Sequence, residues 1–278
     1  MISKTNENLQ IVDRAVFQLS VFKEQEYRLI SDYVKGKTVL HFECGDGSGT
    51  SILSETALKV VGIDKDPENI KNARNKYKND NIEFFTIDAV EKKNIPLQES
   101  VFDSIVSFQT LEELSDPTTY FKEAKRVLRD GGTLILTTPN RSIRLFPFQA
   151  PWNFHHKKEY DYYAVENLTS KYFEEFQIKS LSFTGMCLRR ELGRLTKIKI
   201  FLAPFSAIFI PENIRNKMLE LIWNVFKGDL LFFVGNKENY KATEKEVGYI
   251  KKHIQISDLI GNRTLYFICF CTNRKKMQ

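Results

Sequence analysis

The sequence predicts an α/β fold in which a mostly parallel sheet is covered by helices on both faces. Strand-like apolar segments alternate with helix-like segments over residues 38–138, and an acid follows the end of each of the first three strands. Such alternation forms a parallel sheet, because each helix returns the chain to start the next strand in the same direction. The three acids, Glu43, Asp64 and Asp88, are then expected at one edge of the sheet, where open α/β sheets bind ligands.

The predicted strands are short apolar runs bounded by glycine, proline or charged residues. They cover residues 38–42, 59–63, 82–87, 102–108, 133–138, 176–183 and 264–271. The predicted helices have apolar residues at helical spacing, and one of them begins with the start signal Asp66-Pro67. They cover residues 22–34, 50–57, 67–77, 118–128, 163–172 and 211–227.

The strongest local signal is residues 39–49, VLHFECGDGSG, which join a strand to a glycine-rich bend. Gly45, Gly47 and Gly49 allow the backbone to turn sharply and to approach a ligand without a side-chain clash. Dinucleotide-binding loops have glycine at the first, third and sixth positions, whereas here the third glycine comes one residue earlier. Glu43 precedes the loop, and a carboxylate there suits an ammonium group better than a pyrophosphate.

Two further carboxylates end the second and third strands. Asp64 follows the first glycine of the loop by about 20 residues, the spacing at which an acid accepts hydrogen bonds from ribose hydroxyls. Asp88 can accept the amino group of an adenine, and the small Ala89 leaves room for the edge of that ring. A turn or a helix cap is the alternative role for both acids, although Asp66 is better placed to cap the helix after Asp64.

Residues 43–49, together with Asp64 and the pair Asp88-Ala89, resemble the first three motifs of class I S-adenosylmethionine (SAM)-dependent methyltransferases. Residues 102–112 resemble the fourth strand of that family and its following loop. The resemblance implies a Rossmann-like sheet of seven strands with an antiparallel last strand, and SAM as the cofactor. It divides the chain into a methyltransferase domain, residues 1–183 and 263–278, and a mostly helical insertion or cap, residues 184–262.

The resemblance also assigns residues to the two ends of the cofactor. The expected cofactor-binding residues are Glu43, Gly45, Asp46, Gly47, Gly49, Asp64, Lys65, Asp88, Ala89 and Gln109. Lys65 departs from the family, which commonly has an apolar residue there to cover the adenine. The aliphatic stem of this lysine can take the same place.

Two residues are catalytic candidates. Glu113 stands after the fourth strand where the family often has a histidine, so the role of that histidine is in question here. His156 lies in residues 153–160, NFHHKKEY, which resemble a bacterial branch of the family that often modifies sugars. This histidine can accept a proton from a hydroxyl, or it can merely order the loop. We therefore expect O- or N-methylation of a small-molecule or glycan acceptor between residues 140–160 and the insertion.

The composition bounds the partners. The chain has 278 residues, 42% hydrophobic, with a formal net charge of +6. A dense basic stripe is missing, so no nucleic-acid partner is expected. Basic residues beside the apolar run 198–210 suggest weak association with a membrane surface, and a plain helical cap is the alternative. The four cysteines lack a metal-ligand spacing, so no metal is expected. The apparent lack of a signal segment favours a cytoplasmic location.

Two other functions stay open. An NAD-dependent oxidoreductase would share the sheet and the ribose-binding acid, but the glycine spacing and Glu43 argue against it. A non-catalytic SAM-binding protein would share the whole cofactor site, and Glu113 in place of the histidine keeps this alternative open. The oligomeric state is not readable from the sequence.

Overall fold

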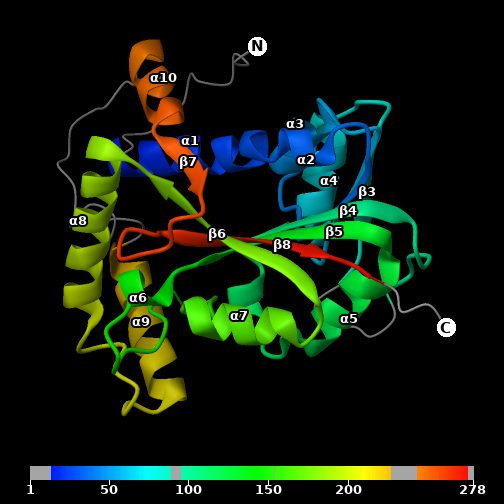
Figure 1. Cartoon of the computed structure of the whole chain (residues 1–278). Coiled ribbons are helices and arrows are strands. Elements are labelled where there is room, and N and C mark those ends of the chain that lie inside the picture. Colours follow the sequence, from blue (N-terminus) through cyan, green and yellow to red (C-terminus); the bar gives the residue numbers. More distant parts are fainter. Residues whose placement is uncertain (1–13, 89–94, 154, 227–242, 275–278) are drawn as a thin grey trace.

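The computed structural model describes residues 14–88, 95–153, 155–226 and 243–274, and a single twisted sheet runs through them (Figure 1). Its strand order is β3-β2-β1-β4-β5-β8-β6-β7. The strands are β1 (Thr38–Phe42), β2 (Lys59–Asp64), β3 (Ile82–Thr86), β4 (Phe102–Phe108), β5 (Leu128–Pro139), β6 (Glu175–Phe183), β7 (Ile254–Ser257) and β8 (Tyr266–Thr272).

The strand directions confirm the predicted fold class. The pairs β1–β2, β2–β3, β1–β4 and β4–β5 are parallel, whereas β8 is antiparallel to both of its neighbours, β5 and β6. The carboxyl ends of β1 to β5 therefore lie along one edge of the sheet, where the three acids Glu43, Asp64 and Asp88 were expected to meet. The first and fourth strands have the predicted bounds, and β2, β3, β6 and β8 differ from prediction by one or two residues at either end.

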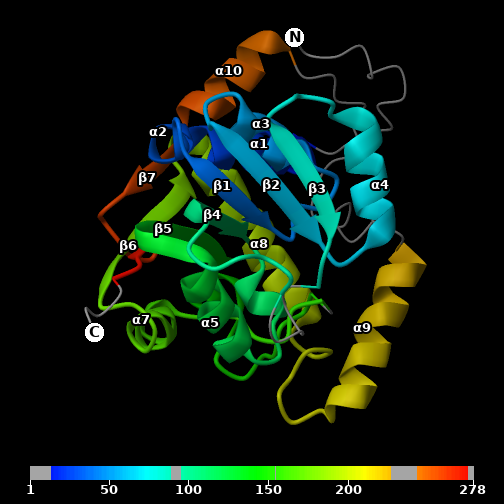
Figure 2. The ribbon, with the colours of Figure 1, turned by 90° about the vertical axis from the view of Figure 1, so that its right-hand side faces the viewer.

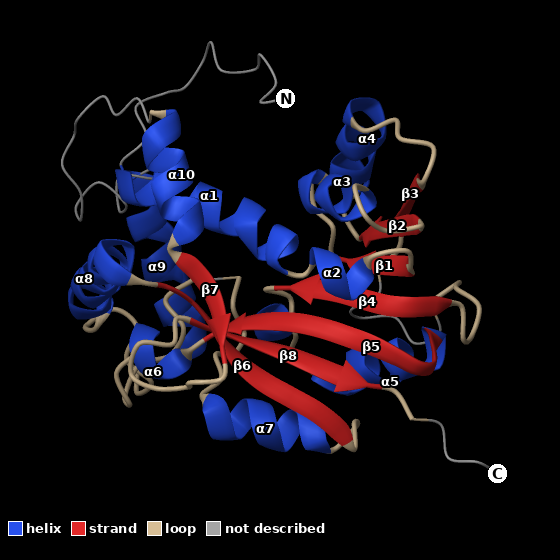
Figure 3. Cartoon of the chain, turned by 45° about the horizontal axis from the view of Figure 1, so that its top comes forward, coloured by secondary structure: helices blue, strands red, loops and turns tan. Residues whose placement is uncertain are grey.

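One strand was not predicted. β7 is antiparallel to β6 and lies at the far edge of the sheet, so the described sheet has eight strands where seven were expected (Figure 3). It falls inside residues 184–262, which were expected to be mostly helical. A strand of four residues is too short for its alternation to stand out from the helical segments around it.

Helices cover both faces of the sheet, as predicted. They are α1 (Arg14–Leu29), α2 (Ser31–Val34), α3 (Ser48–Ser54), α4 (Pro67–Lys76), α5 (Pro117–Val127), α6 (Arg141–Arg144), α7 (Tyr162–Ser170), α8 (Gly185–Leu202), α9 (Glu212–Phe226) and α10 (Glu244–Lys252). The single helix expected over residues 22–34 is two, since the chain breaks at the buried Ile30 and α1 begins eight residues earlier.

Two apolar cores lie on opposite faces of the sheet. Helices α5 and α7 pack on one core, below the sheet in Figure 1, and α1, α3, α8 and α10 pack on the other. Adjacent β1 residues alternate between them, with Leu40 in the first and Val39 in the second. A third, smaller cluster holds α4 against β3 at the sheet edge (Figure 2). Burial on both faces explains why the parallel strands are almost continuously apolar.

The segment after β6 contains α8, α9, α10 and β7. Cys187 and Leu195 of α8 and Ile250 of α10 belong to the same apolar core as sheet residues such as Ile268 of β8. Helix α9 instead packs on α8 through a separate cluster that includes Leu202 and Leu219. The division of the chain at residue 184 stays a prediction, to which the structure adds that α8 and α10 share a core with the sheet.

Candidate active site

The acids predicted at the strand ends are close enough to influence one another. Burial and the negative charges of Asp64, Glu113 and Asp88 together raise the pKa of Glu43 to about 7, while Lys65 opposes the shift. These five side chains come from the ends of β1, β2 and β3 and from the 3-10 turn after β4. The sheet order β3-β2-β1-β4 thus brings them to one edge of the sheet. The expected contact at Ala89 lies outside the described residues.

The backbone is strained at two of the predicted cofactor residues. Glu43 has φ of 50° and Gln109 has φ of 55°, and each directly follows a strand, β1 or β4. Non-glycine residues adopt such angles rarely, and the strain of about 1–3 kcal/mol persists only where surrounding structure holds it. Because β1 and β4 are neighbours, both strained residues lie side by side at the predicted ligand edge.

The three glycines of the loop serve different purposes. Gly45 and Gly47 have positive φ, 54° and 79°, as a sharp turn requires. A Cβ at Gly45 would meet no atom within 4 Å, so this position is open to a ligand, whereas one at Gly47 would lie 2.8 Å from Ala73. Gly49 does not have positive φ, and a Cβ there would overlap the ring of Tyr27. The structure thus explains Gly49 by the packing of α1, a reason the sequence analysis did not consider.

Asp46 makes only local contacts with its side chain. Its Oδ1 accepts a hydrogen bond of 3.0 Å from the backbone N–H of Ser48, and its Oδ2 lies 3.6 Å from Nζ of Lys76. Both contacts hold the exposed loop in shape. Binding of a cofactor by this aspartate stays a prediction.

Asp64 fastens the glycine loop to the next βα turn. Its Oδ2 accepts a 2.8 Å hydrogen bond from the N–H of Gly45, and its Oδ1 accepts from the N–H of Asp66 at 2.8 Å and from Asn69 at 3.3 Å. A carboxylate has about four acceptor positions, so the three donors leave room for a further one. As predicted, the cap of α4 is Asp66, whose Oδ1 accepts from the N–H of Glu68.

A buried oxygen at Glu43 tests whether these residues fit SAM. Glu43 Oε1 is inaccessible to solvent and has no hydrogen-bond partner in the described part of the chain. An unsatisfied buried acceptor costs about 1–3 kcal/mol, so this position calls for a donor. The ammonium group at the methionine end of SAM supplies one, and the open space at Gly45 lies two residues away. The residues present therefore fit the cofactor.

Two buried acids near these residues were not predicted from the sequence. Glu26 of α1 and Glu112, in the turn after β4, are almost completely buried. Burial raises the pKa of each to about 8, and the charge of Glu112 contributes to the shift of Glu26. Glu112 Oε2 accepts a 3.0 Å hydrogen bond from the hydroxyl of Thr138 at the end of β5. Glu26 Oε2 and Glu112 Oε1 have no partner among the described residues.

A signal for Glu26 was present in the sequence. Glu26 lies four residues after Phe22 and four before Ile30, both buried, so it falls on the apolar stripe of the predicted helix. A carboxylate on the buried face of a helix is rare unless it is paired or functional. The apolar spacing predicts the helix, and Glu26 is the one charged residue on its apolar stripe between Phe22 and Ile30.

His156 forms part of a buried charged triad. Its Nδ1 lies 3.0 Å from Oε1 of Glu159, which also accepts a 3.0 Å hydrogen bond from Nε of Arg144. Burial alone would raise the pKa of Glu159, but the positive charge of Arg144 and the hydrogen bonds from His156 and Arg144 lower it below the usual value. With Nδ1 directed at Glu159, Nε2 is the ring nitrogen that does not contact this carboxylate. Arg144 lies in a turn that carries no signal in the sequence.

The triad is tied to the end of β4. The backbone N–H groups of Lys157 and Lys158 donate to the carbonyl of Glu112, at 2.8 and 3.1 Å. This places His156 beside the missed acid Glu112, and the charges of Glu159 and Arg144 reach that acid. The other catalytic candidate, Glu113, is exposed in the same turn, and its charge reaches Glu43 instead.

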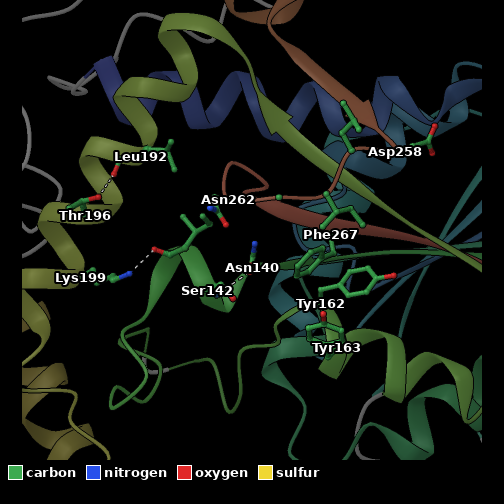
Figure 4. Close-up of a pocket in the computed structure, with 14 residues that line it drawn as sticks. Asn140, Ser142, Tyr162, Tyr163, Leu192, Thr196, Lys199, Asp258, Asn262 and Phe267 are labelled. Atoms are coloured by element: carbon green, nitrogen blue, oxygen red, sulfur yellow. Dashed lines mark hydrogen bonds between the residues drawn. The ribbon is translucent and has the colours of Figure 1, made fainter.

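A cavity of about 990 Å³ opens beside α6 (Figure 4). It lies between α8, the start of α7 and the loop that joins β7 to β8. Its lining is Asn140, Ser142, Ile143, Tyr162, Tyr163, Leu192, Thr196, Lys199, Asp258, Leu259, Ile260, Gly261, Asn262 and Phe267. Asn140 directly follows β5, so the cavity adjoins the ligand edge. Most of its lining comes from residues 140–160 and 184–262, the two segments predicted to enclose the acceptor, whereas Tyr162, Tyr163 and Phe267 lie outside both.

Comparison with known proteins shows a similarity to methyltransferases. Residues 40–136 match the model of a methyltransferase domain, a stretch that includes Glu43, Asp64 and Gln109. A probable SAM-dependent methyltransferase of Mycolicibacterium smegmatis is 30% identical over 136 residues, which are 49% of this chain and 51% of that protein. A ubiquinone biosynthesis O-methyltransferase of Maricaulis maris is 26% identical over 112 residues, 40% of this chain and 44% of that one.

The chain spans about half the length of the curated relatives it matches. A solved SAM-dependent methyltransferase from Thermotoga maritima covers more of it, 93% of this chain and 94% of that chain, with a TM-score of 0.54 and 15% identity. At that identity the likeness concerns the fold alone.

Proposed function

We propose that this chain, whose residues 40–136 match the model of a methyltransferase domain, transfers the methyl group of SAM to a small-molecule acceptor. The observation that carries the proposal is the unpartnered buried oxygen of Glu43 next to the open turn at Gly45. An NAD-dependent oxidoreductase has no use for a carboxylate at that position, since its pyrophosphate would meet a negative charge.

The residues at the strand ends bind SAM and orient it for methyl transfer. When bound, SAM supplies a methyl group on a positively charged sulfur, already activated for displacement. Glu43 accepts from the ammonium group of its methionine end, and the loop at Gly45 approaches its backbone. Asp64 and Asp88 accept from the ribose and the adenine. Alignment of nucleophile, methyl and sulfur can supply on the order of 7–11 kcal/mol of the barrier, so positioning is the main task of the protein.

A hydroxyl acceptor must also lose a proton. In the proposal, Nε2 of His156 takes this proton, and Glu159 stabilises the imidazolium that forms, 3.0 Å from its Nδ1. Arg144 keeps Glu159 ionised before the transfer. An amine acceptor that is already neutral needs no such base. Glu113, whose charge acts on Glu43, stays a second candidate for a catalytic residue.

The acceptor is proposed to be a small molecule or a glycan that enters beside β4 and β5. The cavity next to Asn140 gives it room, and a relative that acts in ubiquinone biosynthesis supports a small-molecule substrate. The glycan alternative rests on the resemblance of residues 153–160. Turnover with SAM over a panel of phenols, amines, sugars and nucleotide sugars distinguishes these acceptors.

The decisive experiment compares two neighbouring aspartates. Calorimetry should show that Asp64→Ala weakens SAM binding at least a hundredfold, while Asp66→Ala, which removes only the cap of α4, lowers stability and leaves the affinity within threefold. Equal affinities for SAM in the wild type and Asp64→Ala would contradict the proposal. NAD serves as the ligand control, and SAM binding without turnover on any acceptor would favour the non-catalytic alternative.

Membrane association stays a prediction. No described helix is long and apolar enough to cross a membrane. Of the apolar run 198–210, Ile198 and Leu202 are buried, whereas Ile208 and Phe209 are exposed between α8 and α9. Flotation with anionic vesicles tests it: loss of binding in the double variant Ile208→Ser, Phe209→Ser is expected if this turn makes the contact.

A further inference from the structure

The cavity beside α6 has a charged end formed by α8. Nζ of Lys199 lies 3.5 Å from the carbonyl oxygen of Ile143 and 4.4 Å from the ring centre of Phe146. Among the described residues no carboxylate forms an ion pair with it, and burial lowers its pKa. Ser142 adds a hydroxyl group to the lining, whereas the hydroxyl of Thr196, one turn earlier on α8, already donates to the carbonyl oxygen of Leu192 at 2.7 Å. A partly buried ammonium without a carboxylate partner favours an anionic ligand.

The opposite end of the cavity is aromatic. The ring of Tyr162 meets those of Tyr163 and Phe267 edge to face, with centres 5.6 and 6.2 Å apart. Figure 4 shows these three rings across the cavity from Lys199 and Thr196. Tyr163 is 74% exposed and Leu259 is 86% exposed, which is unusual for large apolar side chains that line a concave surface. A ligand with an apolar body would cover them.

We propose that this cavity binds an organic anion with an aromatic body, its carboxylate or phosphate at Lys199 and its ring against Tyr162 and Tyr163. The identification of this ligand with the non-reacting part of the methyl acceptor rests on the proposed function, whereas the binding itself does not. The volume of about 990 Å³ is at the upper end of small-molecule sites, so the body can exceed one ring.

Other ligand classes fit the lining less well. A cation would have to use Asp258, but that side chain is 86% exposed at the rim and already pairs with Lys179 at 2.9 Å. A neutral ligand would remove water from the ammonium group of Lys199 without supplying a negatively charged acceptor in its place. An inorganic anion alone would leave the aromatic end uncovered. Only a ligand with both features satisfies both ends.

Calorimetry on the full chain tests the proposal with four probes: phenyl phosphate, benzoate, phenol and inorganic phosphate. Phenyl phosphate and benzoate should bind at least tenfold more tightly than phenol and inorganic phosphate. Lys199→Met should weaken phenyl phosphate at least tenfold, and Tyr163→Ala, at an exposed position that the fold tolerates, at least threefold. Lys197→Met, two residues earlier on α8 and outside the lining, is the matched control and should change the affinity less than twofold.

Three results would overturn the proposal: failure of both aromatic anions to bind, an affinity of folded Lys199→Met within twofold of the wild type, or an equal loss in Lys197→Met. Protection of Lys199 from acetylation by phenyl phosphate, read by mass spectrometry, locates the site independently and should require at least threefold more phenyl phosphate in Tyr163→Ala. SAM binding is measured on the same samples. A wild type that binds phenyl phosphate but not SAM would refute the proposed function and leave this inference standing.

Discussion

The ring of Tyr27 fills the space that a side chain at Gly49 would need. The hydroxyl of the same tyrosine lies 3.2 Å from Nε2 of His41, and Nδ1 of that histidine lies 2.8 Å from the hydroxyl of Thr50. Burial lowers the pKa of His41 to about 3, so the ring stays neutral and both contacts persist at ordinary pH. Helix α1 thus packs directly on the glycine loop, and a substitution that disturbs one of them should also disturb the other.

Gly49→Ala should therefore destabilise the fold. We expect a loss of about 1–3 kcal/mol in the free energy of unfolding, the usual cost of overpacking, measured by urea denaturation. Gly193→Ala is the matched control, because a Cβ there meets no atom within 4 Å in the middle of α8. It should gain about 0.5–1 kcal/mol. A smaller loss for Gly49→Ala in a Tyr27→Leu background would confirm that the clash is with this ring.

Binding of SAM should depend on pH through Glu43. Its pKa is raised to about 7, and only the ionised form pairs with an ammonium group. The dissociation constant should fall about tenfold for each pH unit on the way up to pH 7 and level off above it. Glu43→Gln should remove this dependence between pH 5.5 and 8.5 and bind at least tenfold more weakly at pH 8. A parallel pH profile in both proteins would exclude Glu43 as the source.

Stability of the ligand-free protein should fall as the pH rises. Glu26 and Glu112 have folded-state pKa values of about 8, above the ordinary value of 4.5. Between these limits the folded state retains protons that the unfolded state has lost, so a rise in pH favours unfolding by up to about 1.4 kcal/mol per unit and carboxyl. Glu112→Gln should flatten the profile between pH 5 and 8. A profile that rises over this range would contradict the burial of both acids.

The two buried arginine–glutamate pairs allow a comparison of stability with function. Arg194 pairs with Glu191 inside α8, and Arg144 pairs with Glu159 beside His156. Loss of either arginine should cost about 3–5 kcal/mol, because a buried carboxylate is left without its partner. Only Arg144→Met should also shift the pH profile of kcat for a hydroxyl acceptor. If both variants shift it equally, the triad has no special place in catalysis.

The sequence predicted the parts of the site in which one residue marks a strand end. Glu43 and Asp64 stand directly after apolar strands, and the parallel sheet is enough to bring them together. Arg144 was beyond such reasoning, since its partner Glu159 is reached through a loop rather than along a strand. Gly49 was assigned to a ligand because its steric partner, Tyr27, lies on another element. Contacts between distant segments are what a pattern along one chain does not contain.

The place of β8 between β5 and β6 has a consequence for assembly. Both neighbours precede it in the chain, and α8, α9, α10 and β7 come between β6 and β8. Until β8, residues 266–272, is in place, β5 and β6 each have an open backbone edge that can pair with other chains. Insertion of this strand should therefore be a late and slow step, and truncation just before it should yield aggregates rather than a smaller soluble protein.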